Sequence, residues 1–340
     1  MSALHDHMPA REYPVAAVLP GLTLVALLSA AGYGLRQLPG LALFSPMIIG
    51  ILVGMVFANT FEVPARAVEG IKFAGKKLLR IAVALLGLQI TLTQVSELGL
   101  AGFAVAGTAL FSTFFLTLWL GRRMGISTEL TGLIAAGSSI CGASAIAAAD
   151  AQIHAKDEDV AYAVSCVTIF GTLAMFVFPL LLPVLGLGQA EYGVWSGAAI
   201  HEVAQVVGAG FQGGEDALTI AIVVKLCRVL MLAPLLIVMG VMATRFRPAQ
   251  AGAAKPVLVP FFLVGFVAIM LANSFGLVPA KLADGLIGVT PVLLTLALTA
   301  LGLGTDFARL KSLGIKPLIL GALATLWISG ISLAMSVWLF

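Results

Sequence analysis

Residues 137–146 read Gly-Ser-Ser-Ile-Cys-Gly-Ala-Ser-Ala-Ile, a run of small and partly hydroxylated residues in a chain that is apolar almost throughout. Helices that face hydrocarbon are normally filled with leucine, isoleucine, valine and phenylalanine. Membrane proteins place small residues and hydroxyls where two backbones approach closely, or where a helix opens around a solute. This stretch is therefore the first candidate for a transport site.

The composition of the whole chain predicts an all-α, polytopic membrane protein. Of the 340 residues, 60% are hydrophobic and only 10% are charged, and the mean hydropathy is +1.09. A soluble domain carries about 25% charged residues, and a helix of roughly 20 apolar residues crosses the bilayer core. We expect about eleven transmembrane helices in one transporter domain that covers residues 1–340. The predicted spans are 15–32, 43–60, 77–96, 100–121, 129–149, 160–185, 193–211, 216–243, 257–276, 287–307 and 316–339.

The distribution of positive charge predicts the orientation. Fourteen of the 19 lysine and arginine residues fall on the side shared by the N-terminus and the loops after even-numbered spans, and only Arg36, Lys156 and Lys281 fall on the other side. Cytoplasmic loops are enriched in basic residues. We therefore expect a multi-pass membrane protein with its N-terminus in the cytoplasm and its C-terminus outside.

An internal repeat is visible in the polar residues that interrupt the apolar segments. Ala-Asn-Thr-Phe at 58–61 recurs as Ala-Asn-Ser-Phe at 272–275, and a Val-Pro-Ala triplet follows each copy. Seven predicted crossings separate the copies, so the two copies run in opposite directions, as in the inverted repeats of many secondary transporters. We expect repeat A over about 43–126, central polar spans over 127–256 and repeat B over about 257–340.

A weaker similarity links the spans 129–149 and 193–211, which match at three glycine, isoleucine and alanine positions with a shift of 60 residues. Two predicted crossings separate these spans, so full-length helices would run parallel. That direction conflicts with an inverted pairing. Whether the two spans are repeat partners stays open.

The span 129–149 is the first candidate for a discontinuous helix, because glycines recur every five residues at 132, 137 and 142. An opened helix presents free backbone groups at membrane depth, and the N-terminal end of its second half suits an anion. Tight packing of small residues against a neighbouring helix is the alternative. The residues that we expect to contact the solute are Ser138, Ser139, Gly142 and Ser144.

The span 193–211 contains the second candidate site. His201 and Gln205 lie four residues apart and would share one face of a continuous helix, with Glu202 about 100° away. Ionisable groups inside a membrane usually line a cavity or relay protons, and histidine titrates near neutral pH. We predict that these three residues couple transport to an ion. The alternative is that they anchor the cytoplasmic end of the helix.

The third candidate is the pair Lys225 and Arg228, which lie three residues apart in the middle of the span 216–243. Two cations at this depth need either internal carboxylates or an anionic solute. Glu202 is the obvious internal partner. We predict that Lys225 and Arg228 face the solute, since the arginine fork matches oxyanions, and a structural ion pair is the alternative.

Other site chemistries find no support in the sequence. Cys141, Cys166 and Cys227 all lie in apolar segments without a CxxC pair, which argues against a disulfide framework and a zinc site. The sequence contains no phosphate-binding GxxxxGK[ST] motif, no HExxH motif and no long basic tail that would suggest nucleic acid. We expect no cofactor, no metal, no nucleic-acid partner and no enzymatic activity.

With these residues in view, the chain resembles the YeiH family, which carries the label of sulfate exporters and is related to the cation:proton antiporter and anion transporter group. The match rests on Gly-Ser-Ser-Ile-Cys-Gly-Ala-Ser-Ala-Ile-Ala from Gly137 and on His-Glu-Val-Ala-Gln-Val-Val-Gly-Ala-Gly from His201. In the larger group, each repeat typically contributes a discontinuous helix that crosses its partner near the midplane. The resemblance therefore implies a transporter of the bacterial cytoplasmic (inner) membrane, with sulfate as the first solute to consider.

The sequence predicts a secondary active transporter that exports or exchanges a small anion by alternating access with proton coupling. The expected partners are the anionic solute and the lipid bilayer, and a homodimer is kept open. A sodium-coupled transporter of an organic anion, with Glu202 and Gln205 as sodium ligands, is the alternative within transport. An intramembrane enzyme or a membrane sensor is the alternative of another class.

Overall fold

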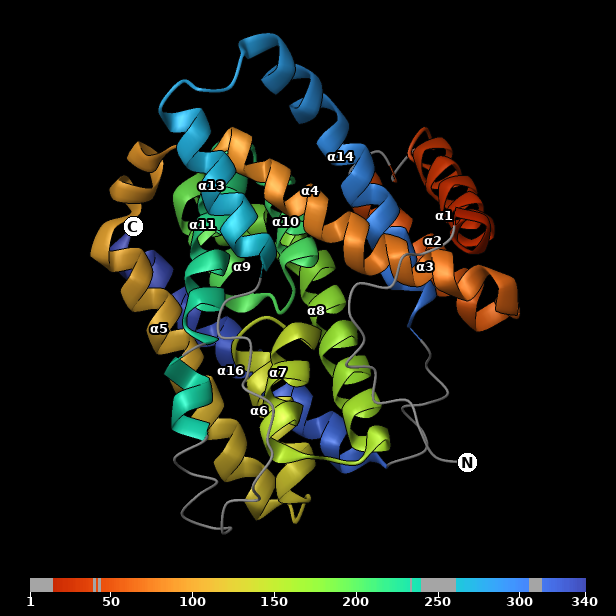
Figure 1. Ribbon diagram of the computed structural model, residues 1–340. Helices are drawn as coiled ribbons and strands as arrows, with labels where there is room; N and C mark the ends of the chain where they lie inside the picture. Colours follow the sequence, from red (N-terminus) through yellow and green to blue (C-terminus); the bar gives the residue numbers. More distant parts are fainter. Residues whose placement is uncertain (1–14, 39–40, 42–43, 233, 240–260, 306–313) are drawn as a thin grey trace.

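A computed structural model of the chain is helical, with no strand among the residues that it describes (Figure 1). These residues are 15–38, 41, 44–232, 234–239, 261–305 and 314–340. The outer ends of four predicted spans, at residues 43, 240–243, 257–260 and 306–307, lie outside this part, as do six of the fourteen basic residues on the N-terminal side. The predicted class, a polytopic helical membrane protein, is confirmed.

In the described part of the chain, six helical segments are long and apolar enough to cross a membrane. Two shorter apolar helices accompany them, together with a run of consecutive helical turns over residues 65–89. The long segments are α1 (Val15–Leu35), the Leu98–Arg123 part of α5 (Leu92–Arg123), α8 (Asp157–Leu185), the segment Glu215–Met239 that begins with α11 (Glu215–Leu230), α14 (Ala280–Leu303) and α16 (Ile315–Leu339). The others are α2 (Pro46–Thr60), η2 (Ala65–Ala67), α3 (Val68–Phe73), η3 (Ala74–Leu78), α4 (Leu79–Leu85), η4 (Leu86–Gln89) and α13 (Phe261–Ser274).

Local sequence signals set several helix boundaries. Ser45 caps α2 by accepting a hydrogen bond from the Ile48 N–H, and Thr91 and Gln94 form a capping box at the start of α5. Gly99 has a φ of 54°, which kinks α5 where its long apolar part begins. The predicted span 77–96 does not coincide with one helix. Helical turns run from Ala65 to Gln89, and the next helix, α5, begins at Leu92.

The span predicted at 129–149 turns back on itself. Its two helices are α6 (Thr128–Ser139) and α7 (Ala143–Ile153). A Cβ placed on Gly132 would lie 2.9 Å from Ile153 Cδ1, and one placed on Gly137 would lie 2.7 Å from Ile146 Cδ1. Early residues of α6 thus face late residues of α7, so the two helices are antiparallel. The expected break is present, and it reverses the chain in a hairpin that we call the first hairpin (128–153).

The span predicted at 193–211 also turns back. Its two helices are α9 (Gln189–Ala199) and α10 (Val203–Gly210). The Tyr192 hydroxyl in the first turn of α9 donates a 3.0 Å hydrogen bond to the Ala209 carbonyl in the last turn of α10. A Cβ on Gly214 would lie 2.9 Å from the Gln189 side-chain oxygen. Residues 189–210 therefore form a second hairpin.

Helix α8 separates the bases of the two hairpins. It begins four residues after Ile153, the end of the first hairpin, and it ends four residues before Gln189, the start of the second. With 29 residues, α8 is about 43 Å long at 1.5 Å per residue. The bases of the hairpins therefore lie at opposite ends of α8, and the two hairpins point toward each other.

The expectation of eleven crossings is not confirmed by this arrangement. Two of the eleven apolar segments fold into hairpins of short helices, and between the two hairpins the chain passes along the bundle once, in α8. The conflict between the direction of these two spans and an inverted pairing disappears. Hairpins whose bases lie at opposite ends of α8 are antiparallel, as an inverted pairing requires. If both hairpins re-enter the membrane, Lys156, between the first hairpin and α8, falls on the side predicted to carry most of the basic residues.

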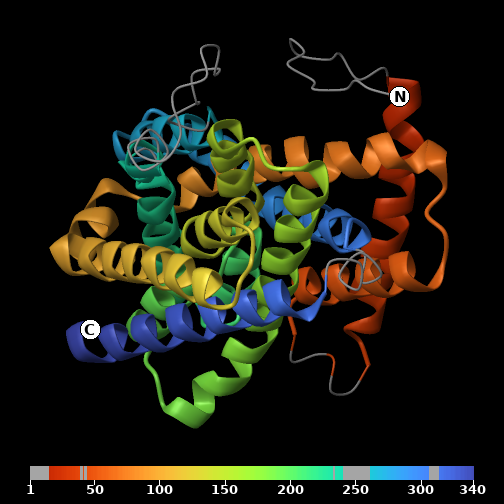
Figure 2. The same cartoon turned by 90° about the horizontal axis from the view of Figure 1, so that it is seen from below.

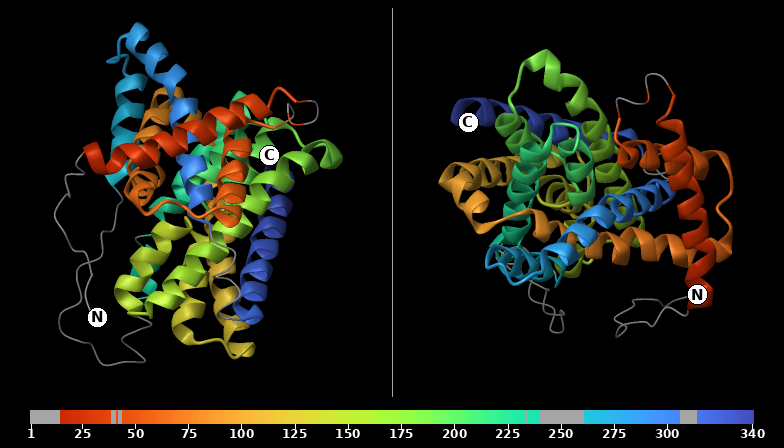
Figure 3. Two further views of the ribbon diagram at one scale, coloured as in Figure 1. Left: turned by 90° about the vertical axis from the view of Figure 1, so that its right-hand side faces the viewer. Right: turned by 90° about the horizontal axis from the view of Figure 1, so that it is seen from above.

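The helices pack in two groups. The hairpin group consists of α5, both hairpins, α8, α11 and α16, and Figure 2 shows α5 and α16 lying side by side within it. The panel group consists of α1, α2, the turns over 65–89, α13 and α14. Figure 3 shows α1 at the outer edge of this group, where it packs against α2 and α14. Helix α10 of the second hairpin contacts the panel group at α2, α4 and α14.

Two asparagines of the predicted repeat make reciprocal contacts in the panel group. Asn59 Nδ2 donates to the Thr305 carbonyl just beyond α14, and Asn273 Nδ2 donates to the Leu88 carbonyl at the end of η4, both at 2.8 Å. Each asparagine thus binds near the end of the second helix of the other copy. The inverted repeat and its boundaries stay predictions, and this exchange supports them.

Candidate functional site

The tips of the two hairpins meet at α11. The first tip consists of Ile140, Cys141 and Gly142, and the second consists of Ile200, His201 and Glu202. Lys225 and Arg228 project from α11 into this junction, and both are fully buried. Lys225 contacts Ile140 of the first tip from 85 positions further along the chain, and Arg228 contacts Ser139, the residue before that tip, from 89 positions further along.

Lys225 joins the two tips through one ammonium group. Its Nζ donates to the Ile140 carbonyl at 2.8 Å, to the Ile200 carbonyl at 2.7 Å and to the His201 carbonyl. An ammonium has three N–H donors and a neutral amine has two, so three carbonyl acceptors match the charged form. All of its donors are therefore engaged by backbone oxygen atoms.

Arg228 makes the same connection one helical turn away. Its Nη2 donates to the Ser139 carbonyl at 2.6 Å and to the Ser138 carbonyl at 3.2 Å, while Nη1 donates to the Ile200 carbonyl at 3.1 Å. The last carbonyls of a helix lack intrahelical partners and carry partial negative charge. The two cations therefore neutralise the C-terminal ends of α6 and α9.

Glu202 lies at the N-terminal end of a helix, whereas Lys225 and Arg228 bind C-terminal ends. It is the N-cap residue of α10, and a Cβ on Gly142 would lie only 2.5 Å from Glu202 Cγ. Its carboxylate accepts from the Thr168 hydroxyl of α8 at 3.4 Å and lies beside the backbone N–H of Ala143, the first residue of α7. The N-terminal ends of α7 and α10, which carry partial positive charge, thus share one carboxylate that is 7% exposed.

Gln205 holds the second tip against α8. Its Nε2 donates to the Thr168 carbonyl at 3.0 Å and to the Thr172 hydroxyl at 3.1 Å, and its Oε1 accepts from the Glu202 N–H. A Cβ on Gly171 would collide with this side chain, so glycine is needed where Gln205 crosses α8. These contacts fix the position of the backbone that carries Glu202.

His201 points away from Glu202. Its Nε2 lies 2.8 Å from the Thr325 hydroxyl of α16, and that hydroxyl donates to the Gly321 carbonyl. The ring therefore donates from Nε2, and Nδ1 is left as a buried acceptor without a partner among the described residues. The expectation that His201 and Gln205 share a helical face is wrong, because the helix is broken between residues 199 and 203.

The serines of the first hairpin differ in their environments. The Ser139 hydroxyl donates back to the Ala135 carbonyl at 2.6 Å. The Ser138 hydroxyl is buried and has no partner among the described residues, whereas Ser144 is exposed on α7. Gly142 has a φ of 68° and a ψ of −130°, a conformation that favours glycine. The structure thus brings eight of the nine predicted site residues to the junction and leaves Ser144 beside it.

Three threonines contact the junction, and no role is predicted for them from the sequence. Thr168 and Thr172 bind the second tip from α8, and Thr325 binds it from α16. A signal exists for the first two, because they lie four residues apart around Gly171 in an otherwise apolar helix. Thr325 has no such signal.

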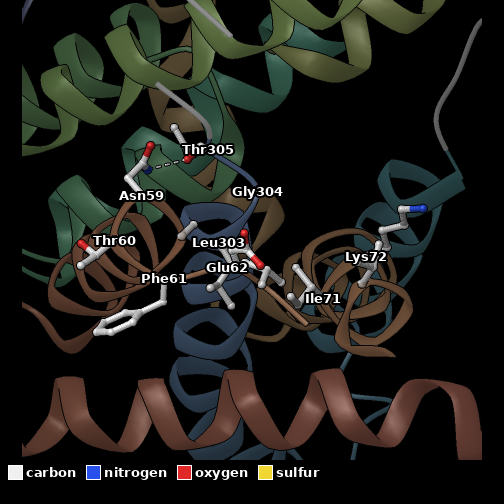
Figure 4. Close-up of a pocket in the computed structure, with 12 residues that line it drawn as sticks. Asn59, Thr60, Phe61, Glu62, Ile71, Lys72, Leu303, Gly304 and Thr305 are labelled. Atoms are coloured by element: carbon white, nitrogen blue, oxygen red, sulfur yellow. Dashed lines mark hydrogen bonds between the residues drawn. The ribbon is translucent and has the colours of Figure 1, made fainter. Parts of the chain in front are cut away.

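A cavity of about 610 Å³ lies in the panel group, where α2 and α14 end (Figure 4). Its polar wall includes Asn59, Glu62 and Lys72, and its apolar wall includes Ile71 and Leu303. None of the nine predicted site residues lines it. The hairpin junction, and not this cavity, gathers the buried charged groups.

Comparisons with known proteins agree with the membrane class, because two similar chains are named membrane proteins. The model of the family described as "Conserved hypothetical protein 698" matches residues 20–321. The chain belongs to this family. It is 36% identical over 317 residues to the "UPF0324 inner membrane protein YeiH" of Salmonella typhimurium, covering 91% of each chain. It is 37% identical over 326 residues to a "UPF0324 membrane protein" of Pseudomonas putida, covering 94% of this chain and 92% of the relative. The resemblance to YeiH is thereby confirmed at the level of the family.

Proposed function

We propose that the protein is a secondary active transporter that exports or exchanges a small anion by alternating access with proton coupling, and sulfate is the first solute to test. The observation that carries the proposal is the meeting of two oppositely directed hairpins around Lys225, Arg228 and Glu202. Broken helices and buried ionisable groups at membrane depth are costly, and they mark solute pathways.

The arrangement of the hairpins supports alternating access. One hairpin approaches the junction from each end of α8, so each hairpin separates the junction from one face of the membrane. The contacts of α10 with α2, α4 and α14 place the second tip at the boundary between the hairpin group and the panel group. Movement of one group against the other would therefore open the same junction to one face of the membrane or to the other.

The predicted solute ligands take different roles in this proposal. Ser138 and Ser144 offer hydroxyls, and the first turn of α7 offers backbone N–H groups beyond Gly142. Lys225 and Arg228 act on the solute through their charge, because backbone carbonyls engage their N–H groups. Glu202 is the proton carrier, and Gln205 positions it.

Flux measurements with the purified full-length protein in proteoliposomes test the proposal. We expect radiolabelled sulfate uptake that follows an imposed pH gradient, and that is lost in Arg228→Ala but retained in Arg36→Ala, which removes an exposed arginine. Unchanged flux in Arg228→Ala, or no movement of any anion in a screen, would overturn it. Flux that follows a sodium gradient and ignores pH would favour the sodium-coupled alternative.

A further inference from the structure

The buried charges at the hairpin junction do not cancel. Four half-helix ends meet there, and the partial negative charges of α6 and α9 offset the partial positive charges of α7 and α10. The net charge of the junction therefore depends on its charged side chains. Lys225, Arg228 and Glu202 are the buried residues with formal charge in the described part of the chain, and together they carry a net charge of one positive unit. A net positive charge at membrane depth favours an anion.

Glu202 itself lies where such an anion would bind. Its carboxylate lies beside the N–H at the start of α7, which belongs to the other hairpin, since a Cβ on Gly142 would lie 3.0 Å from its Oε1. The same carboxylate accepts from the Thr168 hydroxyl. These two donors face a carboxylate oxygen that is chemically similar to an oxygen of sulfate. An exposed hydroxyl, that of Ser144, lies one residue further along α7.

We propose that Glu202 is a tethered competitor of the solute, and that a divalent oxyanion takes its place on the N-terminal end of α7 only when Glu202 is protonated. This inference rests on the proposed function and names its coupling step. A proton from the aqueous phase binds the Glu202 carboxylate and converts it into a neutral carboxyl group. The carboxyl group then leaves the N–H of Ala143 to the oxyanion, and proton and oxyanion depart together on the other side.

The charge sum explains why a divalent anion fits this step. With Glu202 protonated, Lys225 and Arg228 provide two positive charges, which a divalent anion balances. With Glu202 ionised, the same anion would leave the junction with a net negative charge and two carboxylate-like groups on the same donors. Like charges in a desolvated site repel strongly. The solute and the ionised Glu202 therefore exclude each other.

Other ionisable groups also lie near Glu202. Lys225 from α11 and Cys141 from the first tip are its charged or titratable neighbours, α8 presents the Thr168 hydroxyl, and His201 is the next residue on the second tip. Lys225 is held as an ammonium by three carbonyls, and His201 is bonded to Thr325 on the far side of the tip. Glu202 is thus the group whose proton accompanies the solute.

Equilibrium binding of radiolabelled sulfate to the purified full-length protein between pH 5.5 and pH 8 tests this inference. If one proton binds with each anion, the dissociation constant of the wild type rises by up to about tenfold per pH unit once Glu202 ionises. In Glu202→Gln, whose side chain is always neutral, we expect a dissociation constant independent of pH and close to the acidic value of the wild type. Glu191→Gln, in the first turn of the same hairpin, is the matched control and should keep the slope.

The outcomes separate this inference from the proposed function. Sulfate transport by the wild type, combined with an unchanged pH slope in Glu202→Gln, would overturn the competitor role and leave the transporter intact. Loss of the slope in His201→Gln with its retention in Glu202→Gln would assign the proton to the other residue and contradict the inference. Absence of both sulfate binding and sulfate flux in the wild type would overturn sulfate as the solute and this inference with it.

Discussion

The hydroxyl of Tyr192 donates to the carbonyl oxygen of Ala209 over 3.0 Å, and this contact closes the base of the second hairpin. The two residues lie 17 positions apart, in the first turn of α9 and the last turn of α10. A continuous helix of that length would separate them by about 25 Å at 1.5 Å per residue. The contact therefore distinguishes a re-entrant hairpin from a membrane crossing.

Replacing Tyr192 with phenylalanine should destabilise this hairpin without creating a cavity in its core. The variant Tyr192→Phe keeps the ring but leaves the Ala209 carbonyl without its hydroxyl donor. We expect a loss of about 1–2 kcal/mol in the free energy of unfolding, measured by thermal unfolding in detergent. Tyr33→Phe is the control, because the Tyr33 hydroxyl lies 3.5 Å from Thr295 and is partly exposed. Equal effects in both variants would contradict the role of Tyr192.

Lys225 should be needed for the stability of the fold, in addition to any effect on the solute. The variant Lys225→Met keeps the length of the side chain and leaves the Ile140 and His201 carbonyls without their donor, while the Ile200 carbonyl keeps its bond from Arg228. Each unsatisfied buried carbonyl costs about 1–3 kcal/mol, so we expect a loss of about 2 kcal/mol or more in the free energy of unfolding.

The control for this variant is Lys72→Met. Lys72 pairs with Glu69 at 3.3 Å on the surface of the protein, and such exposed pairs contribute about 1 kcal/mol or less. A thermal-unfolding comparison of the two variants decides the question. If Lys225→Met unfolded at the temperature of the wild type, the ammonium would not hold the two tips together.

Gly142→Ala should disturb the first tip more than backbone strain alone explains. Gly142 and Gly99 share a positive φ with an extended ψ, a region that costs other residues about 1–3 kcal/mol. A Cβ on Gly99 meets nothing within 4 Å, whereas one on Gly142 meets the Glu202 side chain. We expect both alanine variants to be destabilised, with a clearly larger loss in Gly142→Ala. Equal losses would show that Glu202 does not pack against this tip.

The sequence predicts the membrane class and the first break because both depend on local composition. Apolar runs and scarce charges suffice for helices in lipid, and the glycines at 132, 137 and 142 indicate an opened helix. The residues at the junction were also identifiable, because charged and histidine side chains are rare in apolar segments. Lys225, Arg228 and Glu202 stand out on this ground alone.

The reversal of both hairpins was not predictable from the same signals. The second break, at Ile200, His201 and Glu202, contains neither glycine nor proline. Tertiary contacts hold it open, since Lys225 and Arg228 bind the carbonyls that a continuous helix would use. A hydrophobic segment also has the same length whether it crosses the membrane or folds into two short helices. Only the pairing of early with late residues reveals the difference.

The side-specific reactivity of single cysteines tests the two opposed hairpins most directly. Single cysteines replace Ile126 and His154, which flank the first hairpin, and Gly188 and Gln212, which flank the second. A membrane-impermeant maleimide is then applied to sealed vesicles of either orientation, in a chain whose three native cysteines are replaced by serine. We predict that both flanks of the first hairpin react from one side and both flanks of the second react from the other. If the two flanks of either segment react from opposite sides, that segment crosses the membrane, and the account of two opposed hairpins is wrong.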